Sequence, residues 1–179
     1  MTLTRRGLFA GIALVATAPA EPAGYRQGDY RAPTPRTLNG IPALSTQEAA
    51  HLWKAGTGIF IDTLPRPPRP PGLPPATIWQ PKPRYDIPGS IWLADTGYGE
   101  LPAIMAVWFA SALHHASNHQ RDRILVFYCL ANCWMSWNAA KRAEALGYTN
   151  VQWYSDGTDG WTEAGLPVEL REPLPRPAE

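Results

Sequence analysis

The chain has 179 residues, of which 45 % are hydrophobic, and its 16 Lys and Arg nearly balance its 15 Asp and Glu, for a formal net charge of +1. A length of this order suits one domain built around one core. The balanced charge argues against a strongly basic surface, so we expect no nucleic-acid partner.

The first 20 residues have the pattern of an export signal. Arg5 and Arg6 precede an apolar run over residues 7–17 that is too short to span a bilayer, and Ala18-Pro19-Ala20 fits a small-residue cleavage site. We expect cleavage near Ala20 and a periplasmic mature protein without a membrane span. The paired arginines also resemble a twin-arginine signal, which leaves the export route open.

The predicted elements then follow in chain order. Residues 21–44 form an extended arm, with polyproline character between Tyr30 and Pro35. A helix begins at Ser45, where Glu48 completes a capping box. A short strand over residues 59–62 ends on Asp62. The proline-rich insertion at residues 64–85 excludes a helix or a central strand.

The second half alternates apolar strands with helices. Strands are expected at residues 91–93, 124–128 and 151–154, and helices at residues 101–116, at residues 135–146 and after Asp156. The pattern predicts an α/β domain over residues 45–170, with a central, mostly parallel five-stranded sheet flanked by helices. Residues 171–179 are expected to form a tail.

Cys129 and Cys133 are the only cysteines, and they lie between a predicted strand and the helix that follows it. Backbone N–H groups at a helix start stabilise a thiolate, so the position favours thiol chemistry. If the pair is catalytic, we expect Cys129 to attack, with a pKa below the free value of about 8.5, and Cys133 to resolve the product. In an oxidising compartment the pair can also form a disulfide, and a purely structural disulfide is the alternative.

Three segments resemble the rhodanese domain. Asp62 closes an early strand, residues 87–91 are similar to the family's Ile-Pro-Gly-Ala-Ile turn, and residues 147–168 resemble its C-terminal signature. The resemblance implies a single rhodanese-like domain with Cys129 at the position of the persulfide-carrying nucleophile. The loop departs from the family, because it holds a second cysteine and no arginine or lysine before Lys141. We therefore expect dithiol or resolved-persulfide chemistry and weak thiosulfate transfer.

A more specific resemblance is to exported rhodanese-like proteins with a paired-cysteine-tryptophan (CXXCW) motif that are associated with PQQ-dependent catabolism. The matching segments are Tyr30 to Pro35, Cys129 to Trp134, and residues 137–140. The resemblance implies an accessory role beside a periplasmic PQQ-dependent alcohol dehydrogenase or its cytochrome c. Two alternatives stay open: a non-catalytic binding module with a structural disulfide, and a sulfurtransferase with an atypical loop.

Other residues are candidates for contact with a substrate or partner: Asp62, Leu130, Ala131, Asn132 and Trp134. Asp62 ends a strand at the sheet edge where ligands bind, and its alternative role is to cap the next turn. For Trp134, the alternative to a partner contact is packing against Trp137. His115 and His119 have a helical metal-ligand spacing, but surface histidines near a helix end are the simpler interpretation, so we expect no metal and no cofactor.

Overall fold

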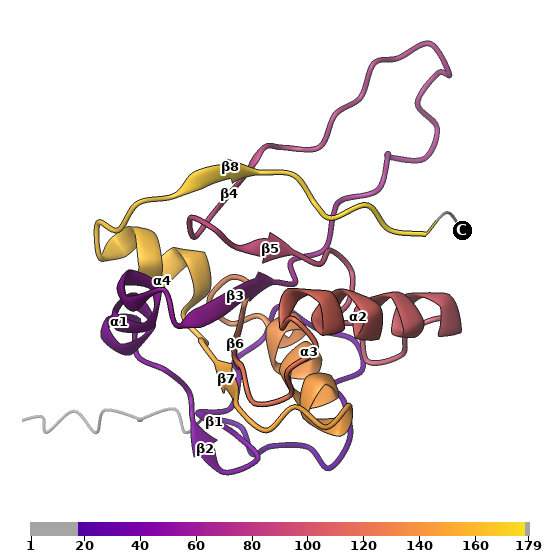
Figure 1. Ribbon diagram of the computed structural model, residues 1–179. Helices are drawn as coiled ribbons and strands as arrows, with labels where there is room; N and C mark the ends of the chain where they lie inside the picture. Colours follow the sequence, from indigo (N-terminus) through magenta and orange to yellow (C-terminus); the bar gives the residue numbers. More distant parts are fainter. Residues whose placement is uncertain (1–17, 178–179) are drawn as a thin grey trace, which may run out of the picture.

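The computed structural model describes residues 18–177 of the chain. Residues 1–17, which hold most of the predicted signal, and residues 178–179 lie outside the described part. The described part forms these elements in chain order: β1 (Thr37–Leu38), β2 (Ile41–Pro42), α1 (Thr46–Ala55), β3 (Gly58–Asp62), β4 (Arg84–Asp86), β5 (Ile91–Trp92), α2 (Ala103–Ala116), β6 (Ile124–Tyr128), α3 (Trp134–Ala145), β7 (Val151–Trp153), α4 (Gly157–Glu163) and β8 (Glu169–Arg171) (Figure 1).

The central sheet has four parallel strands in the order β5-β3-β6-β7. β3 and β6 pair from Gly58 opposite Ile124 to Asp62 opposite Tyr128, so both strands end at one edge of the sheet. The predicted α/β class with a parallel sheet is confirmed, but the described residues give the sheet four strands and not five. β4 and β8 pair antiparallel with each other and form a separate two-stranded sheet.

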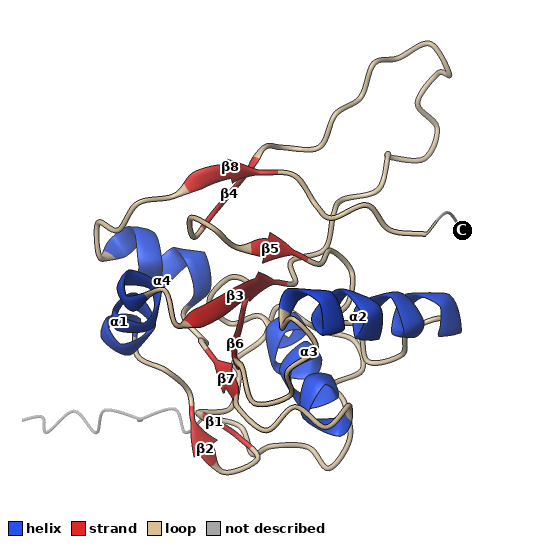
Figure 2. Ribbon diagram, in the orientation of Figure 1, coloured by secondary structure: helices blue, strands red, loops and turns tan. Residues whose placement is uncertain are grey.

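Helices cover both faces of the sheet (Figure 2). The side chains of β6 alternate: Leu125 and Phe127 pack in a core with residues of α2 and α3, whereas Val126 and Tyr128 pack in a second core with residues of α1 and α4. All four side chains are fully buried. Burial on both faces explains why the sequence shows a continuous apolar run at this strand and no polar alternation.

The predicted start of α1 is confirmed in the structure. The Ser45 side chain accepts the Glu48 N–H at 3.3 Å, and the Glu48 carboxylate accepts the Ser45 N–H at 2.8 Å, which completes the capping box. Gly56 ends the helix in the left-handed region, with φ 65°. β3 begins two residues later and carries Asp62 to the sheet edge.

Residues 21–36 are extended and lie along one face of α3. Three residues of that face, spaced i, i+4 and i+7, bind the backbone of the arm: Trp134, Asn138 and Lys141. The Trp134 backbone N–H donates to the Tyr30 carbonyl, and the Asn138 side chain binds the N–H and the carbonyl of Arg26. The Lys141 ammonium donates to the carbonyls of Pro22 and Ala23, and all these distances are 2.8 to 3.0 Å. The arm is therefore a strap whose middle part reaches the start of α3.

The proline-rich insertion contributes no regular structure to the sheet. Residues 63–83 contain no helix or strand and project from the body of the domain between β3 and β4 (Figure 1). Over residues 18–177, none of the helices has both the length and the apolar character needed to cross a bilayer.

Candidate functional site

Cys129 follows β6 at the edge where the parallel strands end, which is where α/β sheets bind ligands. The start of α4 holds the cysteine loop, because the Thr158 N–H donates to the Cys129 carbonyl and the Ala131 N–H donates to Asp159 Oδ2, both at 3.0 Å. Gly157 is needed at this contact. Its φ is 55°, and a Cβ there would lie 2.4 Å from the Cys129 carbonyl oxygen.

Cys129 is fully buried, and its thiol faces oxygen atoms. Its Sγ lies 3.2 Å from Ser136 Oγ, 3.5 Å from the Cys133 carbonyl and 3.7 Å from the Leu130 carbonyl. Ser136 Oγ also accepts the indole N–H of Trp153 at 3.0 Å. Burial, followed by the hydrogen bond with Cys133, raises the pKa of Cys129 well above its usual range. These surroundings favour the protonated thiol.

Cys133 has different surroundings, because it is the N-cap residue of α3. A hydrogen bond from Cys129, opposed by burial, lowers the pKa of Cys133 to about 6. The N–H groups of Met135 and Leu130 lower this pKa further, although neither closes a regular capping hydrogen bond, and the Arg31 guanidinium adds to the effect. The positive end of the helix dipole acts in the same direction. These surroundings favour the thiolate at Cys133 over a thiolate at Cys129.

The positive charge beside Cys133 comes from the arm and not from the loop. Trp134 anchors the arm on both sides of Arg31, since its backbone N–H donates to the Tyr30 carbonyl at 2.9 Å and its indole N–H donates to the Pro33 carbonyl at 3.1 Å. The sequence predicted a loop without a cation near the sulfur. The loop indeed has none, but the tertiary structure supplies one from about 100 residues earlier in the chain.

Both cysteines are free thiols in this structure. The disulfide predicted for the pair is not formed here and stays a prediction for the oxidised protein.

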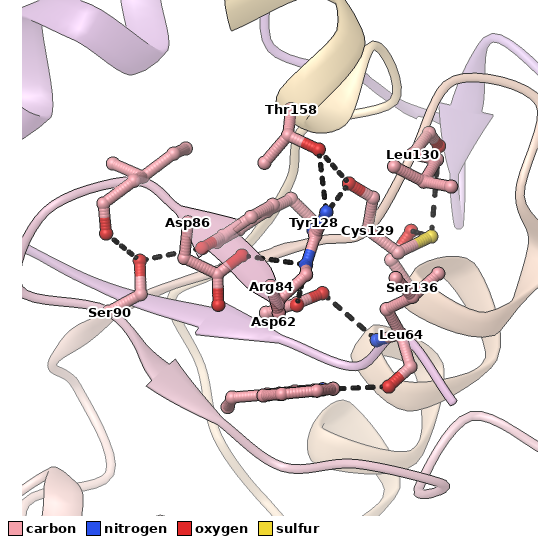
Figure 3. A network of polar contacts seen from close by, with 12 residues as sticks. Asp62, Leu64, Arg84, Asp86, Ser90, Tyr128, Cys129, Leu130, Ser136 and Thr158 are labelled. Atoms are coloured by element: carbon pink, nitrogen blue, oxygen red, sulfur yellow. Dashed lines mark hydrogen bonds and ion pairs between the residues drawn. The ribbon is translucent and has the colours of Figure 1, made fainter. Parts of the chain in front are cut away.

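A buried ion-pair network lies beside the loop (Figure 3). Arg84 Nε lies 2.9 Å from Asp62 Oδ2 and 3.0 Å from Asp86 Oδ1. The other guanidinium nitrogens donate to Thr158 Oγ1 at 3.1 Å and to the Cys129 carbonyl at 3.4 Å. Arg84 thus ties together the ends of β3 and β6 and the start of α4, which is the frame of the cysteine loop.

Two carboxylates in this network share one guanidinium, and both are fully buried. Burial, followed by repulsion from Asp62, raises the pKa of Asp86 to about 8. Neither Asp86 oxygen makes a regular hydrogen bond, and its contact with Arg84 is an ion-pair distance only. The raised pKa favours the protonated form of Asp86 at neutral pH.

The residues predicted to contact a substrate or partner lie at different depths. Asp62 is buried and caps its turn, where Oδ1 accepts the Leu64 N–H at 2.9 Å, so it is no wall of an open cleft. Leu130 packs against the two cysteines, Ala131 is half-buried, and Asn132 is exposed with φ 51°. Trp134 is 2 % exposed and packs edge-on against Trp137, with ring centroids 5.4 Å apart. A partner contact through Trp134 would require the arm to move.

Four polar residues around the sulfurs were not among the residues expected at the site: Arg31, Arg84, Asp86 and Ser136. Arg84 and Asp86 stand directly before the 87–91 turn, and this charged pair at the end of a proline-rich segment was a usable signal. Ser136 follows Cys133 by three residues, which is one helical turn. Nothing local indicated that Arg31 would reach the loop.

The histidines with a metal-ligand spacing lie near the C-terminal end of α2. His119 Nδ1 lies 2.6 Å from His114 Nε2, and the ring of His115 stands 5.9 Å from that of His119. Within residues 18–177, no group of three His, Cys, Asp or Glu side chains is arranged to hold a metal ion.

Comparison with known proteins agrees with this architecture. Residues 81–164, which are under half of the chain, match the family model of the rhodanese-like domain. The structure of a 3-mercaptopyruvate sulfotransferase, SseA from Escherichia coli, is similar with a TM-score of 0.51 and 19 % sequence identity, over 75 % of this chain and 52 % of that one. This similarity supports the fold alone.

Two further solved structures are similar at lower scores. A protein of unknown function and possible tyrosine phosphatase from Rhodopseudomonas palustris is 24 % identical, with a TM-score of 0.47, over 73 % of this chain and 86 % of that one. The polysulfide-sulfur transferase homodimer from Wolinella succinogenes is 17 % identical, with a TM-score of 0.44, over 71 % and 77 %. No curated protein matches the chain.

Proposed function

We propose that this chain, which contains a rhodanese-like domain, is a dithiol protein in which Cys133 attacks a sulfur substrate and Cys129 resolves the product. The asymmetric placement of the thiols supports this. Cys133 occupies the N-cap position of a helix beside Arg31, whereas Cys129 faces two carbonyl oxygens that suit a thiol and not an anion. A ready thiolate next to a second thiol is what thiol–disulfide exchange needs. The order of attack is the reverse of the one expected from the sequence.

The chemistry has two steps. The Cys133 thiolate attacks one sulfur of a substrate disulfide or of a sulfane donor, and the bond to the other sulfur breaks with release of an anion. Cys129 then attacks Cys133 Sγ, so a Cys129–Cys133 disulfide forms and the bound group leaves with the Cys129 proton, as a thiol or as hydrogen sulfide. The pair is oxidised by two electrons and the substrate is reduced by the same two.

The alternatives have less support from the geometry. A persulfide anion on Cys129 would face the carbonyl oxygens of Leu130 and Cys133, which repel negative charge, so a sulfurtransferase built on Cys129 is disfavoured. In a binding module with a permanent disulfide, the two sulfurs would have no need of different surroundings. The difference between Cys129, which faces carbonyl oxygens, and Cys133, at the N-cap position, therefore does not support that alternative.

Mixed-disulfide trapping tests the assignment. With Cys129→Ser, which keeps a hydrogen-bond donor and removes the resolving thiol, the reduced protein should accumulate a stable mixed disulfide with a small disulfide reagent. Its remaining thiol should ionise well below the free value of about 8.5, as measured by thiolate absorbance against pH. Cys133→Ser should do neither. The opposite outcome would reverse the roles, and a wild-type pair that resists ordinary reductants would favour the binding module.

From the sequence resemblance we also propose a periplasmic location and an accessory role beside a PQQ-dependent alcohol dehydrogenase or its cytochrome c. Mass spectrometry of the exported protein should find Glu21 as the first residue, and exported material that keeps Met1 would contradict the signal assignment. Cys129→Ser expressed in the natural host should capture the dehydrogenase or the cytochrome as a mixed disulfide. Capture of neither would remove the support for that partner.

A further inference from the structure

The sulfur-bearing side chains of the site form a buried cluster of their own. Cys129, Cys133 and Met135 pack against one another, separate from the two cores on either side of the sheet, and they are 0 %, 1 % and 1 % exposed. Half-buried Tyr30 and Leu64 cover them. Dithiol exchange uses the two cysteines and leaves the thioether of Met135 without a role.

Met135 is held firmly in this place. It lies in the first turn of α3, two residues after Cys133, and Gly97 packs directly on its backbone. A Cβ at Gly97 would lie 2.2 Å from the Met135 carbonyl oxygen, so the loop after β5 leaves α3 no room to shift here. The three sulfur side chains thus come from one short segment, and Gly97 fixes its helical end.

We propose that Cys129, Cys133 and Met135 form a binding site for one Cu(I) ion. Thiolates and thioethers are soft ligands, and soft ligands select Cu(I) over the hard cations that carboxylates and carbonyls bind. Zinc is a poorer fit, because a structural zinc site takes four N, S or O ligands, and the described residues offer no third His, Cys, Asp or Glu at this place. This inference goes beyond the proposed dithiol chemistry and does not depend on it.

The charges and protons balance. Cu(I) bound by two thiolates and a neutral thioether carries a net charge of −1, and binding releases to solvent whichever thiol protons the pair still holds. The positive charge of Arg31, on the part of the arm that Trp134 holds against the loop, offsets that charge. Arg31 itself is exposed, but half-buried Tyr30 covers the sulfurs beside it, so entry of the ion requires this part of the arm to move. A bound ion and a Cys129–Cys133 disulfide exclude each other.

Competition with a coloured Cu(I) chelator tests the site. The fully reduced full-length mature chain, without oxygen, should withdraw one equivalent of Cu(I) from bicinchoninate, and Cys129→Ser or Cys133→Ser should abolish this. Met135→Leu, which keeps volume and burial, should weaken binding by roughly tenfold or more, on the scale by which single residues tune metal sites. Met105→Leu, at the other buried methionine, is the matched control and should bind as the wild type does.

X-ray absorption of the wild-type complex gives a second measurement that needs no variant. It should show a first shell of three sulfur atoms. Three results would each overturn the proposal. The reduced wild type could fail to take Cu(I) from the chelator, the first shell could hold only two sulfur atoms, or folded Met135→Leu could bind Cu(I) as tightly as the wild type. Trapping by Cys129→Ser is measured without copper, so loss of the copper site and loss of the dithiol function are separate outcomes.

Discussion

Asn138 binds both backbone groups of Arg26: the Arg26 N–H donates to Oδ1 at 2.8 Å, and Nδ2 donates to the Arg26 carbonyl at 3.0 Å. The two residues stand 112 positions apart in the chain. Nδ2 also donates to the Gly97 carbonyl at 2.8 Å, and the Asn138 side chain is fully buried. One amide therefore fixes the arm, α3 and the loop after β5 together.

Asn138→Ala should release the arm. Loss of three hydrogen bonds to a buried amide should lower the free energy of unfolding by about 3 kcal/mol. Trypsin should then cut after Arg26 and Arg31 under native conditions, and Cys133 should react faster with a thiol reagent. Asn150→Ala removes an amide at the edge of the domain and should leave cleavage and labelling as in the wild type. Equal proteolysis of both variants would show that the arm is held elsewhere.

Asp86→Asn should change how stability depends on pH. The folded protein keeps the Asp86 proton up to a pKa of about 8, whereas the unfolded chain loses it near the ordinary value of 3.8. The stabilisation from the neutral acid is therefore complete below the ordinary value and declines as pH rises toward 8, by at most about 1.4 kcal/mol per pH unit. The variant has no such loss, so its stability relative to the wild type should increase with pH across this window.

Urea unfolding at a series of pH values measures this difference. Asp122→Asn, at an exposed acid, is the control and should run parallel to the wild type. If the Asp86→Asn curve is parallel as well, Asp86 is ionised in the folded protein and the assignment of the proton is wrong.

Gly157→Ala should disturb the cysteine loop. A methyl group there meets the Cys129 carbonyl carbon and oxygen at 2.7 and 2.4 Å, in addition to the cost of φ 55°. Gly165→Ala is a matched control, because Gly165 has φ 69° and nothing within 4 Å of an added Cβ. We expect a loss of about 1 kcal/mol for the control and about 3 kcal/mol for Gly157→Ala in chemical denaturation. Mixed-disulfide formation should slow only in Gly157→Ala, and equal losses would contradict the close approach.

Thiosulfate:cyanide sulfur transfer should be weak. Cys129 faces oxygen atoms where a persulfide needs N–H donors, and loss of such donors costs roughly 100-fold or more in rate. Residual turnover should depend on Cys133 and should fall in Arg31→Gln, while Arg36→Gln, farther along the arm, should leave it unchanged. Cyanolysis assays of the reduced protein measure this, and strong turnover that depends on Cys129 alone would refute the proposed roles.

The sequence by itself determined the local elements. The capping box of Ser45 and Glu48 marked α1, the continuous apolar run at residues 124–128 marked a strand buried on both faces, and the cysteines were correctly placed between that strand and a helix. These features follow from hydrogen bonds and side-chain periodicity over a few residues, so they are readable without a fold. The parallel α/β architecture followed from their alternation.

Only the tertiary structure decided the chemistry of the sulfurs. Arg31, Arg84 and Asp62 reach the loop from 45 to about 100 residues away. Arg84 binds the Cys129 carbonyl, while Arg31 and Asp62 shift the pKa values of Cys133 and Cys129 in opposite directions. The tertiary structure also decided the number of strands in the central sheet, since β4 and β8 pair with each other and not with that sheet. The electrostatic surroundings of a side chain and the pairing of strands depend on which distant segments are in contact in the folded protein. The spacing of residues along the chain does not show those contacts.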